Sequence, residues 1–298
     1  MSMRKYFAPI LLMILVMLAG CSVPHVEPTA TPTEEPVPTE TPIPEPTPTI
    51  PPSAAKVNGL YIAIEDVDGK KAQLREAYEQ LGEDIPDDNA LREEALNDLI
   101  EETLFLSAAQ LRGIAPDDHE LDTQTQALCV KLGSCDALKN WQSQNHYSED
   151  SFHRALEREG AAAAMRQVIF DELKNTEQIH VYRIWSYRQA DLNQVLERLN
   201  MGISFVDMAR NYDEVTGGDM SWFPRGVLFS QDLEDKIFSL EAGGHTDILE
   251  IDGAYNIFYV AEKQTGHAMD TQVEQLAQRK ALSDWLEEQK KSADIETF

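Results

Sequence analysis

Two cysteines, Cys129 and Cys135, carry thiols at a spacing that has chemical consequences. Outside the cytoplasm such a pair persists as a disulfide, and Gly133-Ser134 supplies a turn that can bring the two Cα atoms within the required distance of about 7 Å. The spacing is not Cys-x-x-Cys, which argues against a redox role, and no further ligands stand at the spacing that zinc needs. A disulfide and a pair of free thiols both remain compatible with the sequence.

The third cysteine, Cys21, follows a basic start and an apolar run from Phe7 to Leu18, which is typical of an export signal. Leu18-Ala19-Gly20-Cys21 is the lipobox pattern of bacterial lipoproteins, in which the cysteine thiol takes a diacylglycerol. We therefore expect a signal peptide over 1–20 and a lipid anchor at Cys21. The alternative is an ordinary cleavage site, or an uncleaved anchor, with an incidental cysteine.

Residues 21–55 are rich in Pro, Thr and Glu and contain no aromatic residue. Such a segment cannot bury a hydrophobic core. Closely spaced prolines favour polyproline II, with a rise of about 3.1 Å per residue. We expect a stalk that holds a globular head away from a membrane on the outer side of the cell.

The chain is strongly acidic, with 52 Asp and Glu against 25 Lys and Arg and a formal net charge of −27. Binding a polyanion needs a basic face, so nucleic acid is excluded as a partner. The sequence has no polybasic run outside the signal, so membrane attachment is expected to depend on the lipid. No residue pattern indicates a metal or a cofactor, and none is expected.

Most of the chain after the stalk has helical periodicity. Between Leu91 and Ala108 apolar residues recur with a period near 3.6, and Arg112-Gly113 ends the pattern. Further helices are predicted at about 118–131, 135–145, 148–175 and 273–292. Asp117 or Asp118 and Ser148 are the predicted N-caps of the helices that follow them.

A different pattern occupies residues 179–263. Residues 179–187 alternate as a strand, and helices are predicted at 191–200, 205–212 and 233–240. Residues 246–251 and 255–261 form a predicted hairpin about Asp252-Gly253. Between the second and third helices, Gly218-Asp219-Met220-Ser221-Trp222-Phe223 and Gly226 are predicted to form a turn. The order is βα3βα2-like.

This unit, with its Gly-Asp-x-x-Trp-Phe-x-x-Gly stretch, resembles the parvulin-type (rotamase) prolyl isomerases. The helical segment from Leu91 to Asp118 is similar to the SurA N-terminal family, so the whole resembles a SurA/PrsA-type extracytoplasmic foldase lipoprotein. The resemblance implies an α+β fold in which a helical chaperone-like domain over 56–178 is followed by an inserted parvulin-like domain over 179–263. It also implies that the helix in 264–298 folds back on the N-terminal helices, rather than packing on the isomerase unit.

The resemblance also implies the site residues. Arg183 and Asn256 stand where the family has its two histidines, and Glu214 or Asp213 stands in for a Cys or Asp of the family. Phe223, Leu228 and Leu233 match apolar pocket positions. His180 is no substitute for the first histidine, because an odd offset along a strand points a side chain to the other face. A structural interpretation of the same polar residues is an ion pair of Arg183 with Asp213 or Glu214 in a shallow groove.

Two functions follow, with unfolded or newly exported polypeptides as partners in both. In the first, the protein is a membrane-tethered prolyl isomerase that lowers a rotation barrier of about 20 kcal/mol by gripping the proline ring. In the second, it is a binding chaperone whose parvulin-like unit has become a docking domain. A third, simpler alternative is a binding lipoprotein without a role in folding.

Overall fold

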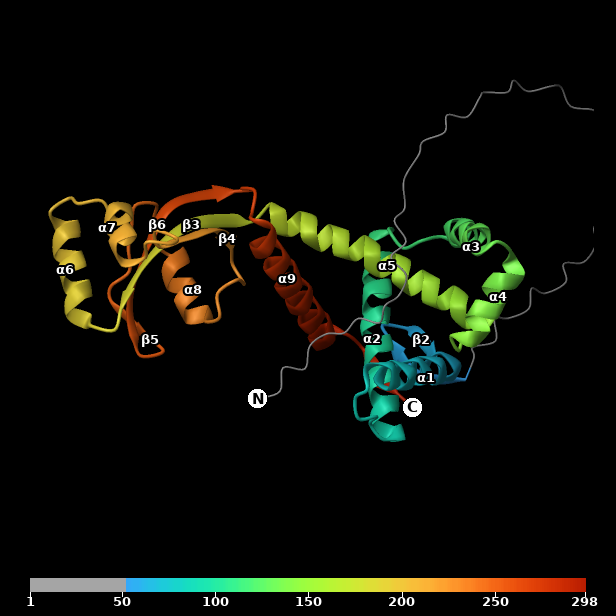
Figure 1. Ribbon diagram of the computed structural model, residues 1–298. Helices are drawn as coiled ribbons and strands as arrows, with labels where there is room; N and C mark the ends of the chain where they lie inside the picture. The colour runs from blue at the N-terminus through green and yellow to red at the C-terminus, as the bar shows by residue number, and fades with distance from the viewer. Residues whose placement is uncertain (1–51) are drawn as a thin grey trace, which may run out of the picture.

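The computed structural model describes residues 52–298, so the predicted signal peptide, Cys21 and nearly all of the predicted stalk lie outside the described residues. The described chain has two parts, which we call the helical module and the sheet unit (Figure 1). Two helices, α5 (Glu149–Lys174) and α9 (Thr271–Ser292), connect them. The fold class is α+β, as predicted.

The other helices of the helical module are α1 (Ile64–Leu81), α2 (Asp88–Arg112), α3 (Asp118–Leu132) and α4 (Cys135–Gln144). Their ends follow local chemistry, since Gly113 ends α2 and the side chains of Asp117 and Ser148 form capping boxes at the starts of α3 and α5. The predicted helix stops and starts at these positions are confirmed.

The module also contains a small antiparallel sheet made from both ends of the described chain. Its strands are β1 (Ser53–Val57), β2 (Leu60–Ala63) and β7 (Ile295–Thr297), in the order β2-β1-β7. The stalk was predicted to run to residue 55, but the folded part begins at Ser53. The reason is that Ala54 and Ala55 are buried in the core beneath this sheet.

The last helix packs on the helical module, as the resemblance implied. The rings of Trp285 in α9 and Phe105 in α2 are stacked with centroids 4.6 Å apart. Ala281, Leu282 and Leu286 of α9 join the same apolar cluster, which includes Met165 of α5. The start of α9 also contacts the sheet unit, where Val273 packs against the core.

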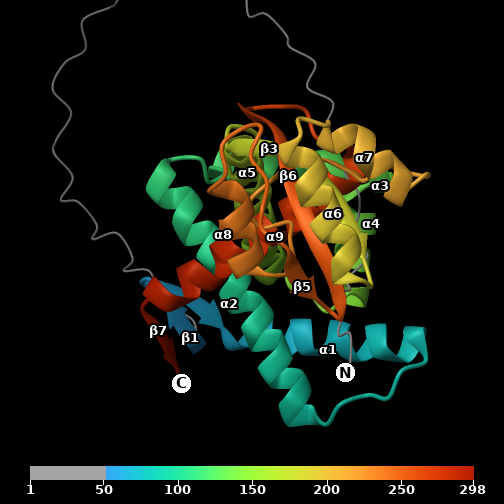
Figure 2. The ribbon, with the colours of Figure 1, turned by 90° about the vertical axis from the view of Figure 1, so that its left-hand side faces the viewer.

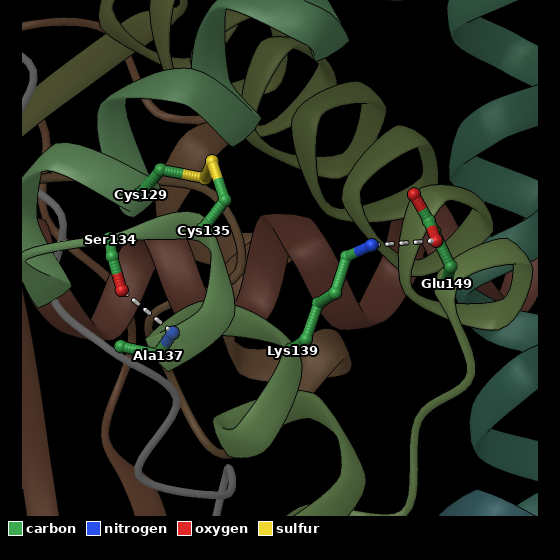
Figure 3. Close-up of a disulfide and its surroundings, with 6 residues drawn as sticks. All are labelled: Cys129, Ser134, Cys135, Ala137, Lys139 and Glu149. Atoms are coloured by element: carbon green, nitrogen blue, oxygen red, sulfur yellow. Dashed lines mark hydrogen bonds and ion pairs between the residues drawn. A yellow bond between two sulfur atoms is a disulfide. The ribbon is translucent and has the colours of Figure 1, made fainter.

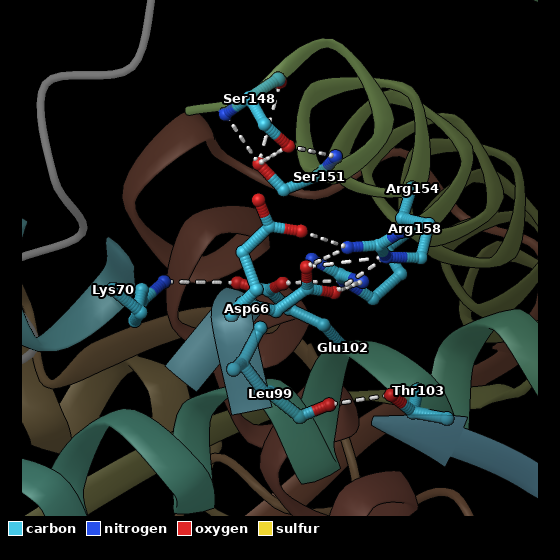
Figure 4. A network of polar contacts seen from close by, with 10 residues as sticks. Asp66, Lys70, Leu99, Glu102, Thr103, Ser148, Ser151, Arg154 and Arg158 are labelled. Carbon is cyan, nitrogen blue, oxygen red and sulfur yellow. Dashed lines mark hydrogen bonds and ion pairs between the residues drawn. The ribbon is translucent and has the colours of Figure 1, made fainter. Parts of the chain in front are cut away.

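A network of charged residues centred on the buried Asp66 and Arg158 ties α1 to α2 and α5 (Figure 4). Asp66 accepts hydrogen bonds from Arg154 Nη2 at 2.6 Å and from Arg158 Nη1 at 2.9 Å. Arg158 Nε also donates to Glu102 at 3.1 Å, and Lys70 Nζ donates to the other oxygen of Glu102 at 2.9 Å. Each guanidinium therefore has a carboxylate partner, which buried charge requires.

Cys129 and Cys135 form a disulfide between α3 and the first turn of α4, with the two Cα atoms 4.4 Å apart (Figure 3). Ser134, immediately before α4, caps it by accepting a hydrogen bond from the N–H of Ala137. Of the two states that the sequence left open for these thiols, the structure has the bonded one.

The sheet unit has the element order β3 (Glu177–Ser186), α6 (Gln189–Asn200), α7 (Phe205–Tyr212), β4 (Asp219–Pro224), α8 (Gln231–Phe238), β5 (Leu249–Ile251) and β6 (Ala254–Thr265). The strands are antiparallel in the order β4-β3-β6-β5. This differs from the predicted βα3βα2 order, because the predicted turn at Gly218–Gly226 contains the strand β4 and the third helix follows it.

Helices cover both faces of this sheet (Figure 2). On one face α6 and α7 pack on Ile184 and Ile257. On the other face α8 packs on Val181 and Val260. In residues 52–298 no helix is long and apolar enough to cross a membrane.

Candidate functional site

Arg183 and Asn256 lie on the face of the sheet that α8 covers, on the two central strands. Arg183 is directly opposite Phe258, and Asn256 is opposite Trp185. Arg183 Nε donates a hydrogen bond to Asn256 Oδ1 at 2.7 Å. Asn256 is fully buried, and its Nδ2 donates to the carbonyl of Ala254 at 2.8 Å. The structure thus brings together two of the predicted polar residues, and the buried amide fixes the orientation of the guanidinium.

Aromatic rings surround the Arg183 guanidinium. Its Cζ lies 5.9 Å from the ring centroid of Trp185 and 5.9 Å from that of Phe258. The ring of Trp185 is 39% exposed and meets Tyr187 edge to face. Such rings attract a cation through their π faces. They also exclude water, and this burial lowers the pKa of Arg183 below its ordinary value.

The predicted ion pair of Arg183 with Asp213 or Glu214 is wrong, because no such pair exists among the described residues. The carboxylate of Asp213 is already used, since it accepts hydrogen bonds from the hydroxyl of Thr216 at 2.5 Å and from the N–H of Val215 at 3.0 Å. These hydrogen bonds lower the pKa of Asp213. Glu214 is exposed in the same turn, and its predicted role in the site stays a prediction.

The three predicted pocket residues differ in exposure. Phe223 and Leu233 are buried in the core beneath α8, with 2% and 6% of their surface exposed, so they support the site from below. Leu228 packs against the same core but is only half-buried. Of the three, Leu228 is therefore the side chain that a bound ligand can reach.

Glu234, which the sequence analysis did not single out, holds Leu228 in place. Its buried carboxylate accepts hydrogen bonds from the N–H of Gly226 at 2.8 Å and of Leu228 at 3.2 Å. A buried acid that binds only main-chain N–H groups fixes a loop. Its position one turn into α8 gave no sign of this contact.

The Gly218-Asp219 pair anchors the edge strand beside Arg183. Arg183 N–H donates to the carbonyl of Gly218 at 2.7 Å. Gly218 has φ +73°, and a Cβ there would lie 2.3 Å from the Arg183 carbonyl oxygen, so only glycine fits. Asp219 Oδ1 accepts from the N–H of Ser221 at 2.7 Å and contacts His180 Nε2 at 2.8 Å.

His180 therefore points away from Arg183, toward Asp219 and the ring of Trp222. This agrees with the prediction that His180 does not replace the first family histidine. The sequence analysis did not place Trp185 in the site, yet it lies beside Arg183. The signal that points to it is its offset of two residues from Arg183, because that offset places both side chains on one face of a strand.

The arrangement has binding chemistry but little capacity for proton transfer. Among residues 52–298, no histidine or carboxylate bonds Arg183 or Asn256, and no group of His, Cys, Asp and Glu is placed to hold a metal ion. Two aromatic rings lie beside the guanidinium donors, and Leu228 packs against the core cluster that contains one of them, Phe258. These groups suit a peptide that carries an apolar ring and an oxygen acceptor.

A hollow lies on the helical module, at residues distant in the chain from the sheet unit. It has a volume of about 660 Å³ and combines apolar with acidic and imidazole groups. Its lining includes Ala63, Ile64, Ala72, Asp68 and His146. Gly69 lets α1 approach the backbone of His146 closely, because a Cβ there would lie 2.6 Å from the carbonyl oxygen of His146.

Comparison with known families matches both parts of the chain. Residues 45–166 match the SurA-like N-terminal domain, and residues 186–262 match the PPIC-type PPIase domain. A curated relative, the foldase protein PrsA of Geobacillus sp. (strain WCH70), is 24% identical over 181 residues, which are 57% of this chain and 63% of the relative. The chain thus spans less than two thirds of that relative's length.

Solved structures to which this chain is similar include the peptidylprolyl isomerase PrsA of Bacillus cereus. It is 18% identical, with a TM-score of 0.41, over 82% of this chain and 93% of that one. A SurA-like chaperone of Campylobacter jejuni is 14% identical, with a TM-score of 0.33, over 83% of this chain and 99% of that one. Two family models thus match this chain one after the other, the SurA-like N-terminal domain first and the PPIC-type PPIase domain after it.

Proposed function

We propose that this chain is an extracytoplasmic protein-folding factor, a parvulin-type prolyl isomerase with chaperone activity, anchored in a membrane through a lipid on Cys21. The observation that carries the proposal is the PPIC-type match over 186–262, which includes Asn256, the hydrogen-bond partner of Arg183, and the half-buried Leu228. The signal-like N-terminus and the PrsA relative support the location outside the cytoplasm.

The site would act by shape and desolvation. The barrier to prolyl rotation, about 20 kcal/mol, comes from resonance that places negative charge on the carbonyl oxygen of a planar amide. Hydrogen bonds from water to that oxygen favour the planar form. Leu228 and Trp185 would hold the proline ring and exclude water from the carbonyl oxygen. The twisted amide would thereby be stabilised relative to the planar one. No proton needs to move.

An exchange measurement tests the isomerase. We expect the purified chain to accelerate cis–trans exchange of Ala-Xaa-Pro-Phe peptides, measured by NMR, across several residues Xaa. Leu228→Asp should abolish the acceleration, because a charge would then stand where the proline ring packs. Met201→Asp, at a position 77% exposed beyond α6, is the matched control and should change nothing. Exchange no faster than without protein, for every Xaa, would exclude the enzyme.

A second candidate function is a holdase without isomerase activity. Two features favour it: the resemblance implies that Arg183 and Asn256 replace both family histidines, and the 660 Å³ hollow, lined partly by apolar residues, lies on the helical module. In this case suppression of aggregation of an unfolded client persists in Leu228→Asp. A chain that isomerises peptides but never suppresses aggregation would remove the chaperone part of the proposal.

Lipid attachment has its own test. In an extracytoplasmic expression host, the wild-type chain should fractionate with membranes and gain the mass of a lipid. Cys21→Ser should release it. A wild-type chain that stays soluble and unmodified would contradict the anchor and leave the isomerase question open.

A further inference from the structure

The terminal NH₂ groups of Arg183 have no hydrogen-bond or ion-pair partner within residues 52–298. Its Nε is used by Asn256 Oδ1 at 2.7 Å. No carboxylate in residues 52–298 forms an ion pair with its two terminal NH₂ groups. One edge of the guanidinium is therefore fixed and the other edge is available. A guanidinium oriented in this way matches the two oxygens of a carboxylate.

Arg154 and Arg158 show what the protein does with other arginines of low exposure. Both bond the carboxylate of Asp66, and hydrogen bonding to Asp66 raises the pKa of Arg154. Burial lowers the pKa of Arg183, because nothing negative offsets it. A partly desolvated cation without a counter-charge is unfavourable, and an incoming anion would remove that cost.

The carbonyl oxygen of the prolyl amide is a poor partner for these donors. A hydrogen bond to that oxygen stabilises the planar, charge-separated form of the amide and so slows rotation. The arrangement is compatible with isomerisation when Arg183 binds a group next to the proline instead. The group that fits a fork of two N–H donors is a carboxylate.

We propose that Arg183 makes the site selective for polypeptides with Asp or Glu adjacent to the proline, through a bidentate pair between its terminal NH₂ groups and the acidic side chain. This rests on the proposed function only in that the site binds proline-containing segments. Trp185 and Phe258 would shield the pair from water, which strengthens it. Glu250, the acidic residue of the neighbouring strand β5, pairs with Tyr255 in the sheet and therefore lies on the opposite face from Asn256.

Binding, rather than turnover, is the primary measurement. C-terminally amidated peptides Ala-Glu-Pro-Phe and Ala-Gln-Pro-Phe are titrated into the purified chain at about 0.15 M salt, which screens the repulsion from its net negative charge. We expect the Glu peptide to bind roughly tenfold more tightly. The preference should disappear near pH 3, where the peptide carboxyl is protonated.

Arg183→Gln should remove the preference, and Arg183→Lys should retain only part of it. Arg198→Gln is the matched control, because it removes the same charge from an exposed position on α6 of the same unit. Thermal unfolding checks that each variant is folded. The pH dependence of the wild type tests the same inference without any substitution.

Equal affinity of the wild type for the two peptides would overturn the inference, as would a preference that survives in folded Arg183→Gln. Tighter binding that requires a free C-terminal carboxyl, with no effect of Glu, would overturn it also. If the Glu peptide binds selectively but no peptide isomerises, the isomerase proposal fails and the inference about Arg183 stands.

Discussion

Asn256 uses both ends of its side-chain amide, although the resemblance implied a histidine at its position. Its oxygen accepts from Arg183 and its nitrogen donates to Ala254 and, at 3.5 Å, to Leu249. One buried amide thus links the guanidinium to β6 and to the edge strand β5. The residue orients the site more than it could react with a substrate.

Asn256→Ala is expected to lower the free energy of unfolding by about 1–3 kcal/mol, because it leaves Arg183 and main-chain carbonyls without partners in a buried place. Urea unfolding measures the loss. Asn193→Ala, at an exposed position in α6, should shift the midpoint little. A similar shift in the two variants would show that Asn256 does not carry this network.

Among the elements, α1 is held to α5 by charged side chains. Asp66 has 1% of its side chain exposed, and its two arginine partners come from one face of α5 (Figure 4). Removing one partner of a buried ion pair leaves an uncompensated charge. This destabilises the fold more than replacing both partners by apolar residues does.

Asp66→Ala should therefore lower the free energy of unfolding by roughly 3–5 kcal/mol. Asp68→Ala is the matched control, since Asp68 is exposed on the same helix two residues later. Chemical denaturation of both variants makes the comparison. If Asp66→Ala lowers the free energy of unfolding by less than Asp68→Ala does, then water or other carboxylates stabilise the charges of Arg154 and Arg158.

Asp98, on the face of α2 next to α1, is expected to destabilise the fold at neutral pH. Burial and the nearby carboxylate of Glu102 raise its pKa, although Lys70 opposes them. A carboxyl group whose pKa is higher in the folded than in the unfolded protein lowers the free energy of unfolding at pH values above that raised pKa. This loss disappears as the pH falls and the group becomes protonated in both states. Asp98→Asn should raise the denaturant midpoint at pH 7, with a smaller gain as the pH falls toward 4. A gain that does not change with pH would contradict this account.

Local chemistry explains which elements the sequence predicts well. The helix at 205–212 has the predicted bounds, and the two-residue turn at Asp252-Gly253 joins β5 and β6 as expected. Strand β4 was missed because residues 219–224 have the composition of a turn and become a strand only by pairing with β3. Such pairing depends on residues about forty positions away, which no local pattern contains.

The site shows the same limit. The sequence analysis interpreted Asp213 or Glu214 as the ion-pair partner of Arg183. In the structure Asp213 accepts a hydrogen bond from Thr216 instead, and the partner of Arg183 is Asn256, 73 residues away in the chain. The burial of Phe223 and Leu233 could not be predicted from the sequence either. An apolar side chain that lines a pocket and one that fills a core look alike in a sequence.

For the whole molecule, the sheet unit is an insertion between α5 and α9. The two crossing points lie together, since Gly266 N–H donates to the carbonyl of Thr176 at 3.3 Å. The helical module is completed by α9 and β7, which follow the insertion in the chain.

Replacing residues 177–265 by a short Gly-Ser linker should therefore leave a folded helical module. We expect a cooperative thermal transition and a helical far-ultraviolet circular dichroism spectrum. The matched variant, with Trp285→Ala in the shortened chain, should melt at a lower temperature because the stack with Phe105 is lost. A shortened chain without a cooperative transition would show that the sheet unit supports the module.

The pairing of β1 with β7 sets an order of events during synthesis. A ribosome delivers Ser53–Val57 well before Ile295–Thr297, so the opening strand lacks one neighbour until the sheet unit and α9 have been translated. The intervening insertion contains all of its own strands and can mature while the module is still incomplete. A stalled or clipped product would thus present a finished sheet unit beside a helical module with an open strand edge and an uncovered apolar face at Phe105.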